Sequence, residues 1–386
     1  MRTLHSDSSD LRETITPIDV TGRSWPVLII GAGPSGLALG KQLRERGIQF
    51  QILERNDVGN SWRHMPKQLK LVSPWKWSFI DSSSRKSFAP NAQLTRAEFE
   101  QYLIEFASKH QLPIIRHCMV NAVERAEGNF RVRTSRGDFT ARIVVNATGY
   151  FSNPVTPQIE GSNDTTIPRI HYAGFSDAQD MVSRIGRGGS VLLVGKRLSA
   201  GQLALELLDA GLNVSISHRT PIRFGVDDWL WPLIYRTFAH IEALRLCFGP
   251  GRTLDVRMPG GRARKLIESG VIKCFPSIKR FAENSVVFEN GDTHSPNIVL
   301  YTTGFAPTLS FLQSLSLKVC PETGVPLTHQ MESVSVPNLF FIGFDMLRNF
   351  QSRFLRGIRK DAVVLADLIQ ARLATSPNAV PELCAP

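Results

Sequence analysis

The sequence predicts an α/β protein with two dinucleotide-binding, Rossmann-like domains, one of them inserted into the other. Three observations carry this expectation. A strand, glycine-rich turn, helix and strand follow one another in residues 26–55, the same unit returns in residues 190–219, and two matching strand ends flank the second copy. At 386 residues the chain is also longer than a typical single domain.

The first unit reads PVLIIGAGPSGLALGKQLRERGIQFQILER. An apolar run typical of a buried parallel strand leads into GxGxxG, and a helix closed by a glycine leads to a second strand. Gly31 makes the tight turn, Gly33 allows a pyrophosphate to approach the backbone, and Gly36 lets the helix pack on the strand. Glu54, at the end of the second strand, can accept hydrogen bonds from a ribose hydroxyl. The unit predicts a dinucleotide site.

The second unit aligns with the first without a gap. Gly195 falls on Gly31, Ser199 falls on Ser35, and Ala200 takes the third glycine position, where alanine is commonly allowed. A second unit with equal loop lengths predicts a second dinucleotide fold.

The two units differ in the charge that follows the second strand. Glu54 is replaced by His218, which Arg219 follows. A carboxylate repels a 2'-phosphate, whereas an arginine pairs with it. We therefore expect the first unit to hold FAD and the second to prefer NADPH over NADH.

Arg197 stands where the second unit would carry its middle glycine. Its side chain crowds the usual approach of the pyrophosphate, yet with Lys196 it offers charge to a phosphate. Two interpretations stay open: an altered but working NADPH site, and a structural fold with weak or no nicotinamide binding.

Two strand ends, IVVNATGY at 143–150 and IVLYTTGF at 298–305, predict the two passages of the chain between the domains. The expected organisation is listed by residue numbers: a tail at 1–22, an FAD-binding domain at 23–158 and 305–374, an NADPH-binding domain at 159–304 with an apolar insertion at 224–261, and a tail at 375–386. The insertion is expected to form a lid or substrate wall, a membrane or partner contact, or plain packing.

Composition excludes several classes of protein. The net charge of +11 is spread along the chain without a basic block, which argues against nucleic-acid binding. No apolar run reaches the roughly 18 residues of a spanning helix, so no integral membrane segment is expected. The five cysteines form no CxxC and no metal-ligand spacing, so we expect no metal. Free thiols suit the reducing conditions of the cytoplasm. The polar N-terminus lacks the apolar segment of a secretory signal peptide, which also fits the cytoplasm.

The ordered motifs resemble the flavin-containing monooxygenases, in particular their smaller bacterial and plant YUCCA-type branch. They are GAGPSG, ER, SW before LKLVSP, ATGY, the second turn, GVIKCFPSIKRF and TTGF, and the likeness extends from Val27 to Ile369. The resemblance implies that NADPH reduces FAD and that O2 gives a flavin C4a-(hydro)peroxide. This species passes one oxygen to a small organic substrate by N- or S-oxygenation or carbonyl oxidation. The resemblance assigns no catalytic side chain. A homodimer is a candidate assembly of the protein.

The resemblance also implies which residues touch the cofactors, with Trp62 in the segment that lines the flavin and Val120 meeting the adenine through its backbone. The expected FAD set is Gly31, Gly33, Pro34, Ser35, Gly36, Glu54, Arg55, Trp62, Val120, Ala147, Thr148, Gly149 and Asp345. The expected NADPH set is Gly195, Lys196, Arg197, Ser199, Ala200, His218, Arg219 and Thr303.

The sequence departs from the family pattern at two places. The FxGxxxHxxxW/Y signature survives only as His171 in TTIPRIHYAGF, and Ser73-Pro74 stands where many members carry a flavin-side asparagine. His171 is open to a structural or a cofactor role. Two alternatives to oxygen transfer therefore remain: an NADPH-dependent flavin oxidase or reductase, and a non-catalytic FAD-binding protein.

Overall fold

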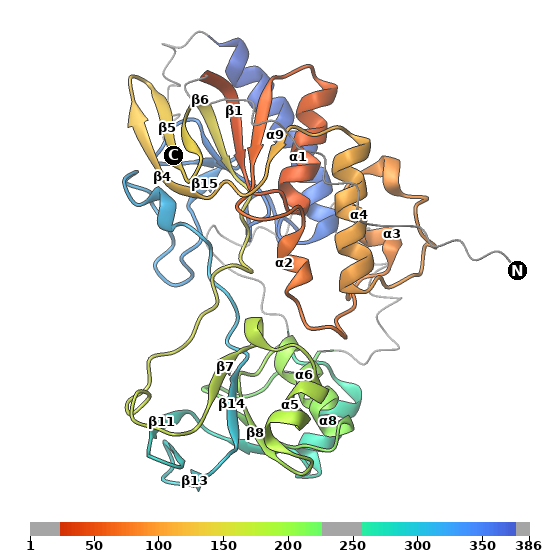
Figure 1. The fold of residues 1–386 in the computed structure, drawn as a ribbon, viewed down its shortest axis with the longest axis vertical. Coiled ribbons are helices and arrows are strands. Elements are labelled where there is room, and N and C mark those ends of the chain that lie inside the picture. Colours follow the sequence, from red (N-terminus) through yellow and green to blue (C-terminus); the bar gives the residue numbers. More distant parts are fainter. Residues whose placement is uncertain (1–23, 226–256, 376–386) are drawn as a thin grey trace, which may run out of the picture.

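The computed structural model describes residues 24–225 and 257–375. Within them the chain forms two lobes joined by two chain segments (Figure 1). The predicted tails, except Thr375, and all but the edges of the apolar insertion at 224–261, lie outside the described residues. No helix in the described ranges is long and apolar enough to cross a membrane.

The first lobe is built on a nine-stranded sheet with the order β15-β16-β17-β6-β1-β2-β3, to which β5 and β4 are added beside β6. Its strands are β1 (Ser24–Ile30), β2 (Phe50–Leu53), β3 (Ile114–Ile115), β4 (Val120–Ala126), β5 (Asn129–Thr134), β6 (Gly137–Asn146), β15 (Thr328–His329), β16 (Glu332–Ser333) and β17 (Leu339–Phe341). Its helices are α1 (Pro34–Glu45), α2 (Asn60–Arg63), α3 (Trp75–Ser78), α4 (Arg96–Lys109) and α9 (Leu355–Ala374), with the short turns η1 (Ser82–Ser84) and η4 (Ser310–Leu312).

The second lobe is built on a parallel five-stranded sheet with the order β10-β9-β8-β14-β7. Its strands are β7 (Arg169–His171), β8 (Ser190–Val194), β9 (Asn213–Ser217), β10 (Lys273–Phe275) and β14 (Ile298–Tyr301). Beside it lie α5 (Ala178–Ile185), α6 (Leu198–Asp209), α8 (Gly261–Glu268), the turn η2 (Tyr172–Gly174), and a small antiparallel sheet of β11 (Ile278–Phe281), β12 (Val286–Phe288) and β13 (Thr293–His294). Because the first sheet takes strands from both sides of this segment, the second lobe is inserted into the first, as predicted.

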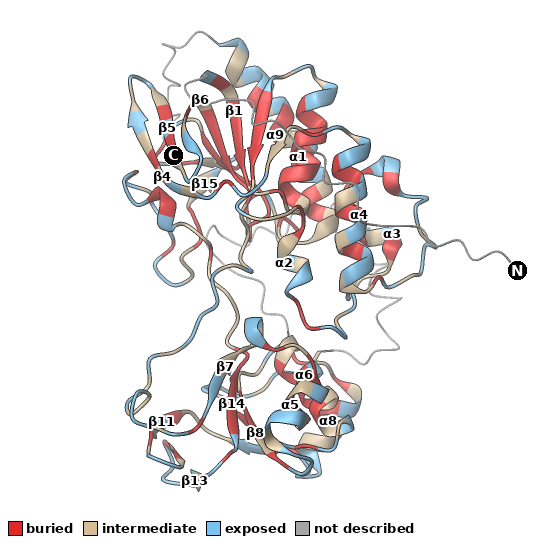
Figure 2. Cartoon of the chain, viewed as in Figure 1, coloured by how far each residue is buried: buried red, intermediate tan, exposed pale blue. Residues whose placement is uncertain are grey.

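The apolar runs of the sequence form the centre of each sheet. Val27, Leu28 and Ile29 in β1 are fully buried, as are Val191 to Leu193 in β8 (Figure 2). Strands buried on both faces need apolar residues at every position, which is why these segments show no alternation. In the first lobe α9 packs along α1. Helix α4 begins after Thr95, which forms a capping box with Glu98.

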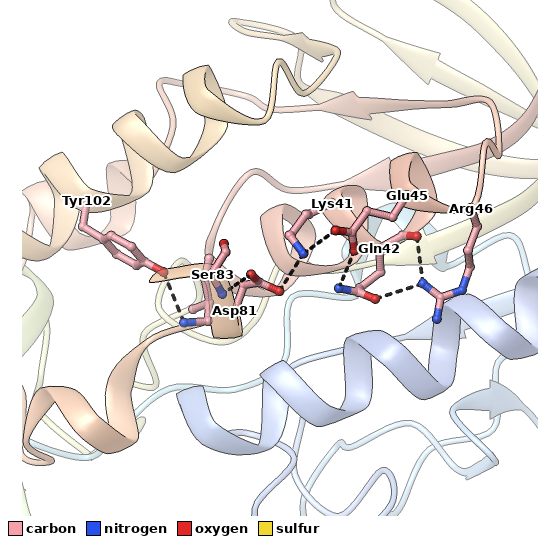
Figure 3. A network of polar contacts seen from close by, with 8 residues as sticks. Lys41, Gln42, Glu45, Arg46, Asp81, Ser83 and Tyr102 are labelled. Carbon is pink, nitrogen blue, oxygen red and sulfur yellow. Dashed lines mark hydrogen bonds and ion pairs between the residues drawn. The ribbon is translucent and has the colours of Figure 1, made fainter. Parts of the chain in front are cut away.

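A polar network fixes α1 against its surroundings (Figure 3). The Lys41 ammonium lies 2.8 Å from Glu45 Oε1 and 2.9 Å from Asp81 Oδ2, and only 9% of its side chain is exposed. Asp81 Oδ1 also accepts a hydrogen bond from Ser83 N at 2.8 Å. Arg46 binds Asp367 on α9 at 2.7 Å. These contacts hold the helix whose first residues form the glycine-rich turn.

Asp81→Asn should lower the free energy of unfolding by about 1–3 kcal/mol, because it removes the buried charged partner of Lys41 and leaves only the exposed Glu45 carboxylate to pair with it. Burial alone would raise the pKa of Asp81, but hydrogen bonds from Ser83 and Lys41 and the charge of Lys41 bring it below its usual value. The stabilisation is therefore present above the unfolded-state pKa and is lost as the pH falls through the lower folded-state pKa. Urea unfolding at pH 7 and at acid pH measures both effects.

Glu45→Gln is the matched control, since the Glu45 side chain is 54% exposed and its removal should cost less than about 1 kcal/mol. Equal losses for the two variants would contradict the buried role of Asp81.

Candidate functional site: two dinucleotide turns

The two predicted turns lie at the carboxyl ends of the central strands of their sheets, with the same local geometry. Gly31 N donates to Leu53 O at 2.8 Å, and Gly195 N donates to Ser217 O at 3.0 Å. Both glycines have a positive φ, +109° and +149°. Ligands in open parallel sheets bind at this edge, so both turns are placed where a dinucleotide binds.

The three glycines of the first turn serve different purposes. A Cβ on Gly36 would lie 2.0 Å from Gly31 O, and one on Gly31 would lie 2.9 Å from Ala147 O. Both are therefore required by packing. A Cβ on Gly33 would meet no heavy atom of the described chain within 4 Å. Open space at the N-terminus of α1 fits a phosphate, whose charge the helix end stabilises.

The geometry explains how the second turn tolerates Arg197. Gly33 has φ −83° and Arg197 has φ −105°, and each is the N-cap of its helix. Neither conformation requires glycine, so the backbone at this position of the turn can carry a side chain. Arg197 is exposed, while Ser199 is half-buried and Ala200 is fully buried.

Helix α1 begins with Pro34, and the next residue, Ser35, is buried. A Cβ on Gly343 would lie 2.1 Å from Ser35 Oγ, so the chain after β17 passes directly over the start of α1. This contact closes one side of the first turn.

The Glu54 carboxylate is held beside the first turn. Its Oε2 accepts from Ala32 N at 2.7 Å and its Oε1 from Asn56 N at 2.9 Å. A carboxylate has about four acceptor positions, so capacity for ribose hydroxyls remains. Cys118 N donates to Glu54 O at 2.8 Å, which brings Val120, two residues later, to the same corner. Arg55 is exposed there.

The side chains around the second turn are cationic. Lys196 Nζ donates to Thr220 Oγ1 and, at 3.3 Å, to Pro221 O, which ties the turn to the loop after β9. Arg219 lies in this loop and is exposed. Burial lowers the pKa of His218, a bond with the Thr220 backbone opposes this, and the charge of Lys196 lowers it further. The corner therefore attracts anions through lysine and arginine rather than through histidine.

The two chain passages lie side by side. Ala147 N donates to Ile30 O and Thr302 N to Val194 O, both at 2.9 Å, so each passage begins against the turn of its own lobe. Further on, Val155 N donates to Gly304 O at 3.0 Å, and Thr303 Oγ1 donates to Val155 O.

The first passage also holds the predicted residues Thr148 and Gly149. Thr148 Oγ1 donates to the buried Asn146 Oδ1 at 2.7 Å, and Gly149 O accepts from Thr308 N at 3.4 Å. These contacts keep the passage close to the second one.

Asp345 and Trp62 border the same edge of the first sheet. Tyr150 Oη donates to Asp345 Oδ2 at 3.0 Å, and Arg353 Nη1 lies 3.2 Å from this carboxylate oxygen. Trp62 packs edge-on against Phe99, with ring centroids 4.5 Å apart. A cavity of about 330 Å³ lies next to α2 and both passages, and its lining includes Arg55, His64, Phe151, Ala173 and Phe305.

His171, the last residue of β7, links the turn η2 to the second passage. Its Nδ1 accepts from Ala173 N at 3.0 Å, so Nε2 carries the proton and donates to Gly304 O at 3.0 Å. Its ring also packs edge-on against Phe305, 5.1 Å between centroids. Both ring nitrogens are therefore engaged within the protein.

Sequence reasoning missed Gln351, which is 1% exposed and has both amide atoms without a hydrogen-bond partner among the described residues. The one sequence feature that pointed to Gln351 was its position between the predicted Asp345 and the last helix. It also missed Tyr150 as the partner of Asp345, since nothing in the sequence relates positions so far apart. No cluster of metal-ligand side chains occurs in the described part of the chain.

Two lobes, one inserted into the other and each with a dinucleotide turn at the carboxyl ends of parallel central strands, define a two-domain nucleotide-dependent flavoprotein oxidoreductase. The chain belongs to the pyridine nucleotide-disulphide oxidoreductase family, whose sequence model matches residues 28–343, and its relatives place it among the flavin-containing monooxygenases. Its cofactors are accordingly FAD and NADPH.

Three relatives show the range of similar proteins. An uncharacterised CzcO-like oxidoreductase of Geobacillus kaustophilus is 28% identical over 88% of this chain and 96% of its own length. The probable indole-3-pyruvate monooxygenase YUCCA4 of Arabidopsis thaliana is 26% identical over 88% of each chain. The bacilliredoxin reductase Bdr of Bacillus subtilis is 25% identical over 82% of this chain and 88% of its own.

Among solved structures, a flavin monooxygenase from Stenotrophomonas maltophilia, in a variant with two substitutions, superposes with a TM-score of 0.74. It is 26% identical, and the match covers 91% of this chain and 99% of that one.

His171→Phe should lower the free energy of unfolding at pH 8 by about 1–3 kcal/mol, because it removes both ring hydrogen bonds and keeps the aromatic contact. Burial lowers the pKa of His171, although its bond to Gly304 opposes this. The stabilisation is thus complete above the unfolded-state pKa of about 6.5 and is lost as the pH falls through the lower folded-state value. Denaturant unfolding from pH 8 to pH 5 should show the two proteins converging.

His329→Phe, at an exposed histidine of β15, is the control and should cost less stability at pH 8 than His171→Phe. A difference between wild type and His171→Phe that stays constant with pH would refute the neutral, doubly bonded histidine.

Proposed function

We propose that this chain is an FAD-dependent, NADPH-consuming monooxygenase that transfers one oxygen atom from O2 to a small organic molecule. The reaction is N- or S-oxygenation or carbonyl oxidation. Bound FAD, reduced by NADPH, supplies the chemistry of oxygen activation. The protein binds both cofactors, orients them and excludes water from the reacting centre. The proposed setting is the cytoplasm, which suits free thiols.

The observation that carries the proposal is the opposite charge at two otherwise equivalent turns. The first turn has the Glu54 carboxylate 2.7 Å from Ala32 N, and the second has Lys196 bonded to the loop of Arg219. A carboxylate suits the ribose hydroxyls of FAD, and a guanidinium suits the 2'-phosphate of NADPH.

The proposed FAD contacts follow from this arrangement. Gly33 and the N-terminus of α1 (Pro34, Ser35) receive the pyrophosphate, since a Cβ at Gly33 meets open space. Glu54 binds the ribose, Val120 and Arg55 border the adenine, and Ala147 to Gly149, Trp62 and Asp345 border the rest of the cofactor. Gly31 and Gly36 bring the turn and helix together.

The proposed NADPH contacts involve the second turn. Gly195 and the start of α6 (Ser199, Ala200) approach the pyrophosphate, and Arg197 and Lys196 add positive charge to it. Arg219 binds the 2'-phosphate, with His218 and Thr303 bordering the site.

A disulfide or flavin reductase is the second candidate, favoured by the likeness to Bdr. A dithiol mechanism is less well supported because the sequence contains no CxxC. The purified protein distinguishes the candidates when NADPH, O2, H2O2 and product are measured together in a screen of amines, thioethers and ketones.

A monooxygenase consumes NADPH and forms oxygenated product with little H2O2. Stoichiometric H2O2 without product for every substrate would indicate an oxidase instead. Protein that binds FAD but does not oxidise NADPH would be a non-catalytic FAD-binding protein.

Gly33→Val should abolish retention of FAD, because its side chain fills the space proposed for the pyrophosphate. The stability of the FAD-free protein should change little, since that space is free of described protein atoms. Flavin absorbance per mole of purified protein and urea unfolding of the apoprotein measure the two effects. Unchanged flavin content would refute the assigned site.

Arg219→Ala should raise the KM for NADPH by about one to two orders of magnitude, as expected for the loss of a charge-assisted contact of roughly 1.5–3 kcal/mol. The KM for NADH should change little. Steady-state kinetics with both nucleotides provides the test, and equal effects on both would contradict the 2'-phosphate role.

A further inference from the structure

The two lobes share no hydrophobic core in the described part of the chain. The core of the first lobe is built from buried side chains within residues 25–147 and 311–369, and the cores of the second lobe lie within residues 167–301. Two domains without a large apolar interface move relative to each other unless other contacts hold them. The orientation of the lobes in Figure 1 therefore depends on the two passages and on polar contacts between the lobes.

Lys67, in the segment after α2 of the first lobe, makes two such contacts with the second lobe. Its backbone N–H donates to Ser176 O at 2.8 Å, and its ammonium lies 2.8 Å from Asp177 Oδ2. Asp177 is the N-cap of α5, and its other carboxylate oxygen accepts from Asp180 N at 2.8 Å, so this carboxylate is fixed. The side chain of Lys67 is 59% exposed, so water and salt can reach the ammonium.

The corner of the second lobe that Lys67 meets is acidic. Glu206 of α6 accepts from Ala178 N at 3.3 Å. Burial raises the pKa of Glu206, the bond from Ala178 opposes this, and the charge of Asp177 adds to the rise. The hydrogen bond from Lys67 holds the pKa of Asp177 below its usual value. Lys67 therefore compensates negative charge that belongs to the other lobe.

The two segments that Lys67 joins both line the cavity of about 330 Å³. Met65, just before Lys67, lines it from the first lobe, and Ala173, just before Ser176, lines it from the second. Met65 is only 8% exposed, yet it belongs to none of the hydrophobic cores of the described residues. Its burial therefore depends on the segments around the cavity and not on the core of a lobe.

We propose that Lys67 and Asp177 form a reversible latch between the lobes, which holds the two sides of this cavity together and limits the entry of small molecules. Opening exchanges one exposed ion pair and one backbone hydrogen bond for bonds with water, and no shared core has to be separated. Salt screens the ion pair and so favours the open state. The inference goes beyond the proposed function and requires neither cofactor, because the latch and the cavity are formed by the chain alone.

Oxidation of Met65 by hydrogen peroxide measures the opening of the cavity, because the reagent must reach the thioether to form the sulfoxide. Peptide mass spectrometry follows each methionine separately. Lys67→Gln and Asp177→Asn each remove one charge of the latch, and asparagine is also a good N-cap, so α5 is retained. Each should speed Met65 oxidation about two- to fivefold, the range expected for an exposed ion pair. The double variant should show no further increase, because both changes break the same contact.

The controls separate opening of the latch from general loosening of the protein. Met119, which is 50% exposed, and Met331, which is fully buried in the first lobe, should be oxidised at unchanged rates in every variant. Lys76→Gln removes an exposed lysine whose ammonium donates to Asn91 Oδ1 at 3.0 Å within the first lobe. This variant should leave the oxidation of Met65 unchanged.

The latch is refuted if Asp177→Asn leaves Met65 oxidation unchanged, since an increase in Lys67→Gln alone would be a local loosening of its own segment. Effects that multiply in the double variant would refute it as well.

If a variant unfolds, which faster oxidation of Met331 would reveal, the wild-type protein still provides a test. Raising the NaCl concentration to about 0.5 M should speed the oxidation of Met65 and leave that of Met119 and Met331 unchanged. No effect of salt on Met65 would overturn the proposal. Flavin content and NADPH oxidation are measured separately, and their absence would refute only the proposed function.

Discussion

The close approach of backbone to backbone at the first glycine turn is the constraint on which the rest of the site depends. A Cβ on Gly36 would lie 2.0 Å from Gly31 O, and one on Gly31 would lie 2.9 Å from Ala147 O. Helix, turn and neighbouring strand can meet only because both side chains are missing. Once they meet, the N-terminus of α1, the first chain passage and the segment after β17 converge on one edge of the sheet.

The same backbone geometry serves two chemistries because the side chains around it differ. The hydrogen bond that closes each turn is nearly identical, 2.8 Å and 3.0 Å, whereas the first corner holds Glu54 and the second holds Lys196 and Arg219. In the proposed function, the turn fixes the position of a dinucleotide, and the charge at the strand end selects which one. Arg197 is compatible with this arrangement of the turn, because its backbone conformation does not require glycine.

The two passages between the lobes form a paired connection rather than two independent linkers. Val155 bonds to Gly304, and His171 attaches the second passage to η2 through both of its ring nitrogens. A connection of this kind ties the two lobes together where the chain passes between them.

The sequence by itself determined both dinucleotide units and the insertion of one lobe into the other, because glycine spacing and apolar runs act over short distances. It also indicated the charge contrast of Glu54 and Arg219, since each residue directly follows its strand. It left the role of His171 open, and it gave no sign that Tyr150 bonds to Asp345 or that the Gln351 amide lacks a partner. Only the tertiary structure decided these points, because hydrogen-bond satisfaction and burial depend on residues that are distant in the chain and meet only when the sheets are assembled.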